Sequence, residues 1–250
     1  LNLASNTFNE NNTAYWHKSV GGYHAAKLRR YQEMIEEHIS DEMQGLYGAV
    51  ADVGGDMKKL DASEFPVLNM LNTRYFIFPL QGGQTAPLPN PFALGNAWFV
   101  DEVQYVSNAN EEIEAIHGLN PQQTAVVDKK FESIVKSIPS DAMDTIELVT
   151  YEPNYLKYEI DSKKGGTVVF SEIYYPGWQS TIDGKEAAHG RANYILRAMN
   201  VPAGKHVVEF RFDPKSLHTT ETIAFIALGL LALLAVVVIV MKIKACRKVG

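Results

Sequence analysis

Cysteine is almost absent from this 250-residue chain, and the only one, Cys246, lies close to the C-terminus. A disulfide framework is therefore excluded, and the folded part must be held together by its apolar core. The seven histidines form no HxxxH or HxH pair, and the chain contains no GxSxG sequence. We therefore predict no catalytic residue, no metal site and no cofactor for the chain itself.

Positive charge is also scarce. The chain has 23 lysines and arginines against 29 aspartates and glutamates, which gives a formal net charge of −6. Four of the positive charges belong to residues 242–250, so the part before this tail is more acidic still. An acidic surface repels phosphates, and nucleic acid is accordingly not expected as a partner.

A long apolar run is present instead. Residues 223–241 (IAFIALGLLALLAVVVIVM) contain no charged side chain. At about 1.5 Å per residue a helix of this length spans roughly 28 Å, close to the ~30 Å hydrocarbon core of a bilayer. We predict a transmembrane helix that anchors the chain in a lipid bilayer. The alternative, a buried helix of a large soluble core, is usually shorter and seldom ends beside a C-terminal basic cluster.

The basic residues on either side of this run give it a direction. Two precede it within fifteen residues, and four follow it in the tail of residues 242–250. Lysine and arginine near a span mark its cytoplasmic end, so we expect residues 1–222 outside the cytoplasm and the C-terminus inside. The opposite arrangement, a tail-anchored protein with a cytoplasmic domain, stays open as the alternative.

The first residues, LNLASNTFNE, include neither Met nor a basic segment followed by an apolar one. A leader of that kind is what carries a large domain across a membrane. We therefore expect the chain to be the C-terminal piece of a longer protein, with an N-terminal transmembrane part of the same protein as its partner.

Residues 1–140 mix helical and strand patterns, which predicts a mixed α/β region. A stripe at helical spacing that includes His24 predicts a helix over residues 23–39. Further helices are expected at residues 42–50, 64–71 and 110–117, and strands at residues 74–78, 97–106 and 124–127. Residues 81–91 (QGGQTAPLPNP) hold so many glycines and prolines that we expect a loop there.

From residue 141 to residue 216 the apolar pattern alternates with a period of two, which is typical of strands. Strands are expected at residues 145–151, 155–160, 167–174, 179–182, 194–199 and 206–212. Turn sequences such as Pro176-Gly177 and Asp183-Gly184 separate them, which predicts an antiparallel β-sandwich. The expected fold class is α+β, with the transmembrane helix at residues 217–241 and a basic cytoplasmic tail at residues 242–250.

Five segments, in order along the chain, resemble one family. They are GGYHAAKLRRYQ from residue 21, NMLNTRYFI from residue 69, NPFALGNAWFV from residue 90, YYPGWQSTIDGKEA from residue 174 and RANYILRAMNVPAGKHVVEFRF from residue 191. They are similar to the C-terminal end of the bacterial YfhO-like multispan membrane proteins, which closes with the same single span.

The resemblance implies a protein of the bacterial cytoplasmic membrane similar to the GT-C class of glycosyltransferases. That class uses polyprenyl-phosphate-linked sugars, and some relatives are associated with glycosylating cell-envelope polymers. It places its essential acidic residues in an early extracytoplasmic loop. No such loop occurs in this sequence, so the resemblance assigns no catalytic residue here.

Two sets of side chains are candidates for binding. His24, Lys27 and Arg30, beside two glycines, could hold a lipid phosphate at a helix N-terminus, although such cations usually just solvate a helix face. The second set could stack on a sugar and accept hydrogen bonds from it, although aromatic rings in a sandwich are more often core. It consists of Tyr174, Tyr175, Trp178 and Asp183.

Three functions compete for this chain. An extracytoplasmic, non-catalytic C-terminal module of a membrane glycosyltransferase-like protein agrees best with the resemblance. The alternative is an anchored carbohydrate-binding or envelope-interaction module with no enzyme attached, and a free-standing hydrolase comes third because no site for it is visible. The expected partners are the bilayer, the transmembrane part of the same protein, and a polyprenyl-phosphate sugar or an envelope glycan.

Leu231→Arg tests the membrane anchor because it puts a charge near the middle of the apolar run. We expect insertion to become less favourable by roughly 3 kcal/mol, since a charge must enter the hydrocarbon core. The measurement is the share of the protein in the membrane fraction, with Leu231→Phe as the matched control. Equal fractionation of the two variants contradicts a spanning helix.

Overall fold

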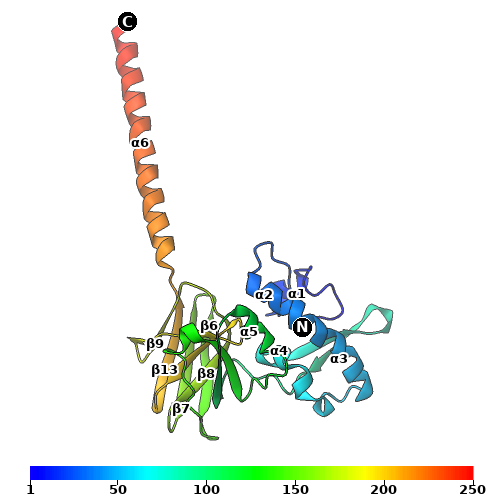
Figure 1. Cartoon of the computed structure of the whole chain (residues 1–250). Coiled ribbons are helices and arrows are strands. Elements are labelled where there is room, and N and C mark those ends of the chain that lie inside the picture. The colour runs from blue at the N-terminus through cyan, green and yellow to red at the C-terminus, as the bar shows by residue number, and fades with distance from the viewer. Residues whose placement is uncertain (250) are drawn as a thin grey trace.

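The computed structural model describes the backbone of residues 1–249 and the side chains of residues 1–244. The side chains of Cys246, Arg247 and Lys248 in the predicted tail, and all of Gly250, lie outside the described residues. The described chain has a folded part of helices and several sheets, followed by one long helix that stands away from it (Figure 1). This mixture confirms the predicted α+β class.

Most helices of the folded part are short. Their bounds are α1 (Asn12–Trp16), α2 (Arg29–Met34), the π-helical turn η1 (Ile35–Ile39), α3 (Ser40–Asp52), α4 (Pro66–Met70), α5 (Ala109–Glu114) and the 3₁₀ turns η2 (Met57–Lys59), η3 (Ala62–Glu64), η4 (Gln81–Gly83) and η5 (Lys129–Phe131).

The longest helix of the folded part differs from the sequence-based expectation. α2, η1 and α3 follow one another without a gap, so a single helix runs where the pattern predicts two, and it starts at Arg29 rather than at residue 23. Residues 23–28 are not helical because this stretch is bonded to the chain before it. The Tyr23 N–H donates to the Asn11 Oδ1 at 2.9 Å. His24 therefore lies in an exposed turn ahead of the helix and not on its buried stripe.

The predicted loop over residues 81–91 contains a strand. β1 (Tyr75–Pro79) pairs antiparallel with β2 (Thr85–Pro89) across η4. The Asn90 N–H donates to the Arg74 carbonyl on the β1 side, so the nitrogens of Pro87 and Pro89 face the outer edge. An edge needs no N–H donor, and proline is tolerated there. The loop prediction is wrong because it counts prolines without their position in a ladder.

The strand predicted over residues 97–106 divides at Asp101. β3 (Ala97–Val100) joins a sheet of the sandwich, while β4 (Glu102–Val106) pairs in parallel with β5 (Thr124–Asp128), with α5 between them. Asp101 is held at the division by Ser140, whose N–H and hydroxyl donate to its carboxylate at 3.1 and 3.0 Å. One sandwich sheet thus includes a strand that comes from before residue 140.

The alternating pattern of residues 141–216 forms the six predicted strands, of which β12 starts two residues later than expected, and two short strands, β10 and β11, that were not predicted. They are β6 (Thr145–Glu152), β7 (Tyr155–Ser162), β8 (Gly166–Ile173), β9 (Trp178–Ile182), β10 (Lys185–Glu186), β11 (Gly190–Ala192), β12 (Leu196–Val201) and β13 (Gly204–Phe212). One antiparallel sheet has the order β10-β9-β13-β7-β6, and the other has the order β11-β12-β8-β3.

The core between these two sheets is built around three rings. Tyr158, Phe170 and Phe210 are fully buried and meet edge to face, with centroids 4.9, 4.8 and 6.1 Å apart. The turns follow the predicted chemistry: Asp183 and Gly184 both have positive φ, at 51° and 76°, as a two-residue type I′ hairpin requires. Alternation and turn residues therefore specify this half of the fold together.

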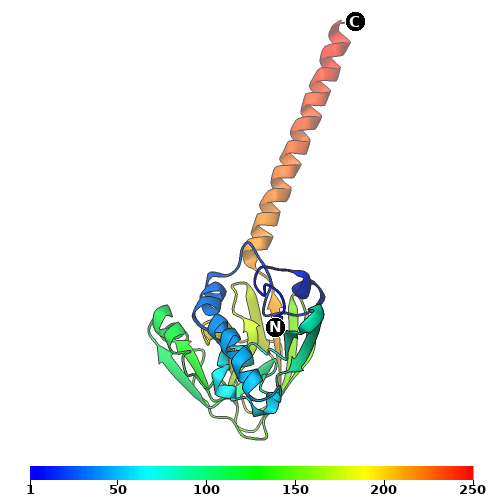
Figure 2. The same cartoon turned by 90° about the vertical axis from the view of Figure 1, so that its right-hand side faces the viewer.

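The long helix α6 (Lys215–Val249) contains the predicted span and, from Lys215 to Lys244, is apolar enough to cross a membrane. It follows β13 after only two residues, and the Asp213 N–H donates to the Gly177 carbonyl at 2.9 Å. Figures 1 and 2 show it leaving the folded part at one end, and the N-terminal segment, defined as residues 1–28 and drawn in dark blue, lies at that same end.

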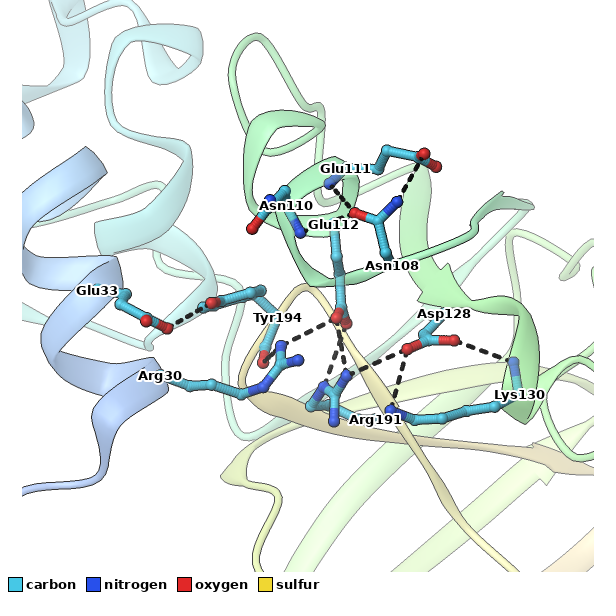
Figure 3. A network of polar contacts seen from close by, with 10 residues as sticks. All are labelled: Arg30, Glu33, Asn108, Asn110, Glu111, Glu112, Asp128, Lys130, Arg191 and Tyr194. Carbon is cyan, nitrogen blue, oxygen red and sulfur yellow. Dashed lines mark hydrogen bonds and ion pairs between the residues drawn. The ribbon is translucent and has the colours of Figure 1, made fainter.

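A buried ion-pair network connects the two halves of the folded part (Figure 3). The carboxylate of Glu112 on α5 is fully buried and accepts hydrogen bonds from the guanidinium of Arg191 on β11, at 3.2 and 2.8 Å, and from that of Arg30 on α2, at 2.9 Å. Arg191 also lies 3.7 Å from Asp128 at the end of β5. Four elements distant in sequence therefore share one cluster of charges.

The turn between β11 and β12 completes this connection. Asn193 and Tyr194 have positive φ, at 47° and 69°, and the Asn193 side chain accepts from the Val126 N–H of β5 at 2.8 Å. The Tyr194 hydroxyl donates to Glu33 on α2 at 2.5 Å, and Arg30 lies over the Tyr194 ring at 4.2 Å. Helix, parallel strand pair and sandwich are held in one arrangement by this turn.

Glu112→Gln tests the network because the amide keeps the shape of the side chain and removes its charge. We expect the free energy of unfolding to fall by about 3–5 kcal/mol, since two arginines lose their counter-charge in a buried site. Denaturant unfolding measures it, and Glu114→Gln on the exposed face of α5 is the matched control. Equal stabilities of the two variants contradict a structural role for the network.

Candidate functional site

An open groove of about 1760 Å³ lies between the N-terminal segment and the sandwich. One wall comes from residues 13–24 and 26–28, and the other from Leu148 and Tyr151 of β6 and residues 171–173 of β8. Residues 71–75 also line the groove. These ends of β6 and β8 lie beside the strand ends that lead into α6, because β6 turns into β7 there and β7 pairs with the end of β13. We name it the membrane-side groove.

The wall made by the N-terminal segment is fixed by hydrogen bonds. Backbone bonds of Leu1 and Leu3 with Ile77 attach its start to β1. Near its end, the Tyr31 hydroxyl donates to the Val20 carbonyl at 2.6 Å. A Cβ at Gly21 would lie 2.3 Å from the Thr7 carbonyl oxygen, so only glycine allows this close approach. The groove therefore has a defined shape on this side.

Polar side chains face each other across the groove. The Lys18 ammonium lies 3.0 Å from the centroid of the Tyr151 ring, which joins the two walls by a cation–π contact. Glu172 of β8 lines the same region. Burial raises the pKa of the Glu172 carboxyl, and the positive charges of Arg197 and Lys18 oppose that rise. A carboxylate, an ammonium and a phenol thus converge where a polar ligand could enter.

Arg197 of β12 lies directly behind this part of the groove. Its side chain is nearly fully buried, its Nε donates to the Ile173 carbonyl at 3.0 Å, and its guanidinium lies 4.0 Å from the centroid of the Trp178 ring. Burial lowers the pKa of Arg197 to about 10, and Glu172 opposes the shift, so the group stays charged at neutral pH. The Arg197 Nη1 and the Tyr158 hydroxyl have no hydrogen-bond partner among the described residues.

The three residues predicted to contact a lipid phosphate separate in the structure. His24 and Lys27 line the groove, where the His24 Nδ1 accepts from the Ala26 N–H at 3.1 Å and the Lys27 ammonium lies 5.3 Å from the Phe8 ring. Arg30 is not part of the lining, because its guanidinium is bonded to Glu112. Two of the three therefore share a surface and the third belongs to the buried network.

The four residues predicted to contact a sugar do not form one pocket. Tyr174 packs against Phe131 and Tyr175 is exposed, whereas Trp178 covers Arg197. Asp183 follows the other end of β9, about 16 Å along the strand from Trp178 at the usual rise per residue. There its carboxylate pairs with the His206 Nδ1 at 2.7 Å.

Sequence reasoning missed the groups that do come together at the groove. Lys18, Tyr151 and Glu172 are distant in sequence and match no motif, and Arg197 reads as one more residue of an alternating strand. The only sequence feature that could have pointed to this site is in β8, where the carboxylate of Glu172 follows a run of mostly apolar residues (TVVFSE). In the part of the chain that the structure describes, no group of three potential ligands could hold a metal ion.

Comparison with known proteins gives one finding. A family model described as bacterial membrane protein YfhO matches residues 117–241, which extend from the end of α5 through the sandwich into α6. Neither the curated proteins nor the solved structures contain a match to the chain.

Trp178→Ala tests whether this ring belongs to the core. We expect the free energy of unfolding to fall by about 3–5 kcal/mol, because the ring packs on Phe212 and covers the Arg197 guanidinium. Thermal unfolding measures the change, and the exposed Tyr175, changed to Ala, is the control with an expected effect below about 1 kcal/mol. Unchanged stability together with weaker glycan binding would instead make Trp178 a stacking platform.

Proposed function

The chain belongs to the YfhO family of bacterial membrane proteins, and on that premise we propose that it is the extracytoplasmic, non-catalytic C-terminal module of a glycosyltransferase-like protein. The substrates of that glycosyltransferase-like protein are polyprenyl-phosphate-linked sugars for cell-envelope glycosylation. Its partner is an N-terminal transmembrane part of the same protein in the cytoplasmic membrane. Residues 1–222 lie outside the cytoplasm and the C-terminus lies inside.

The observation that carries this proposal is the place of the membrane-side groove. The groove is lined by the N-terminal segment, which lies at the end of the folded part from which α6 leaves (Figures 1 and 2), and this places the groove on the side that faces the bilayer in our proposal. A lipid-linked sugar has its phosphate at the head-group layer and its sugar just above. The groove is the surface of this module that such a ligand would reach first.

The lining of the groove has side chains that suit both the phosphate and the sugar of such a ligand. His24 and Lys27 lie on its N-terminal wall, where a cation can attract a phosphate. Lys18, Tyr151 and Glu172 offer donors, an aromatic face and a carboxylate to sugar hydroxyls and CH groups. In this assignment the module positions the lipid-linked sugar, and the transmembrane part of the protein carries out the transfer.

The predicted sugar-contact set has a smaller part in this proposal. Tyr175 is the exposed member of that set and can meet a glycan at the same end of the sandwich. Tyr174 and Trp178 pack against other side chains and Asp183 lies at the other end of β9, so this proposal gives these three residues no ligand contact.

A double variant, His24→Ala with Lys27→Ala, tests the phosphate part of the assignment. We expect the affinity of the membrane-reconstituted chain for a polyprenyl-phosphate sugar to fall about tenfold, a loss of about 1.4 kcal/mol. The measurement is equilibrium binding in vesicles, with Lys163→Ala, outside the groove lining, as the control.

Two results contradict the proposal. One is unchanged binding in the double variant, and the other is glycosyl transfer by the 250-residue chain alone.

A further inference from the structure

Three large aromatic side chains of the N-terminal segment are exposed to solvent. Tyr15, Trp16 and Tyr23 have exposed fractions of 77%, 70% and 53%, and the first two rings meet edge to face at 4.8 Å. Single exposed apolar residues are common on protein surfaces, but a group of rings on one segment marks an interaction surface. These three residues line the membrane-side groove and are not part of the core.

The place of this segment determines what these rings can meet. Both views put the N-terminal segment at the end of the folded part from which α6 leaves (Figures 1 and 2). Residues 215–222 of α6 precede the apolar run and span about 12 Å. The head-group layer on each side of a bilayer is about 5–8 Å thick, so the folded part stands close above that layer.

The charges of the segment also suit a lipid surface. It holds Lys18 and Lys27 against a single carboxylate, Glu10. That carboxylate is engaged at the start of α1, where it accepts from the N–H groups of Asn12 at 2.6 Å and of Thr13 at 3.2 Å. Tryptophan and tyrosine are the residues enriched at membrane interfaces, because each has an apolar body and a polar group at one end.

We propose that the N-terminal segment is a second membrane contact, in which Tyr15, Trp16 and Tyr23 rest in the head-group layer of the bilayer that α6 crosses. The occupant of this surface is lipid. The contact holds the folded part against the membrane at a second point, so that it cannot swing freely about the start of α6. The proposal does not depend on the sugar-binding role of the groove.

The test uses the 250-residue chain in vesicles of phosphatidylcholine and phosphatidylglycerol. Cys246→Ser removes the native thiol, and Ala14→Cys or Met143→Cys then carries an environment-sensitive fluorophore. Ala14 is exposed next to the rings, whereas Met143, exposed by 65%, precedes the end of β6 opposite to α6. A nitroxide lipid labelled near the head group quenches only fluorophores at the bilayer surface.

We expect the label at position 14 to be quenched about threefold more strongly than the label at position 143, because only the first lies at the interface. Adding Tyr15→Ser and Trp16→Ser should reduce the quenching at position 14 to the level at position 143. Leu80→Ser, an exposed apolar residue outside the segment, is the matched control and should leave it unchanged.

Two results overturn the proposal. Equal quenching at positions 14 and 143 shows that the segment stays in water and makes no contact with lipid. Strong quenching that survives the double serine variant shows that the rings do not make the contact.

Discussion

The arrangement of the helices and sheets in the folded part depends on the buried carboxylate of Glu112. A fully buried charge is tolerated only when it is paired and hydrogen-bonded, and here two guanidinium groups from distant segments supply the pairing. Arg30 comes from the first long helix and Arg191 from the sandwich, so the burial of one side chain fixes the position of both. The N-terminal wall of the groove follows from this, because residues 1–28 lead directly into the helix that carries Arg30.

The strands of the sandwich could be predicted because the sequence features that specify them are local. Alternation places every second residue in the core, and turn sequences such as Asp183-Gly184 fix where each strand reverses. The strands predicted from residue 145 onward therefore agree with β6 to β9, β12 and β13. The first half was predicted less well because tertiary contacts override its local pattern. Gly22 and Tyr23 are bonded to the preceding loop, and Pro87 and Pro89 are tolerated only because β2 has a free edge.

The candidate site was predictable only in part, for the same reason. His24 and Lys27 are recognisable in the sequence as neighbouring side chains that can bind an anion, and both do line the groove. Arg30 has the same appearance in sequence, yet its partner lies 82 residues away, and nothing in a helical pattern reveals that pairing. Lys18, Tyr151 and Glu172 meet only because the N-terminal segment folds back over β6 and β8. A site built across such a fold has no spacing signature.

The attachment of α6 has a mechanical consequence. β13 leads into the helix after two residues, and it is paired with β7 on one side and with β9 on the other. A pull along the membrane normal therefore loads β13 in shear, so that many backbone hydrogen bonds resist together instead of opening one at a time. Gly177 packs closely against Pro214 at this junction, because a Cβ at Gly177 would lie 2.9 Å from the Pro214 Cβ. The two residues between β13 and α6 therefore have little room to move. Tension along the membrane normal would therefore reach the sandwich as strain on its central strand, through the two closely packed residues between β13 and α6.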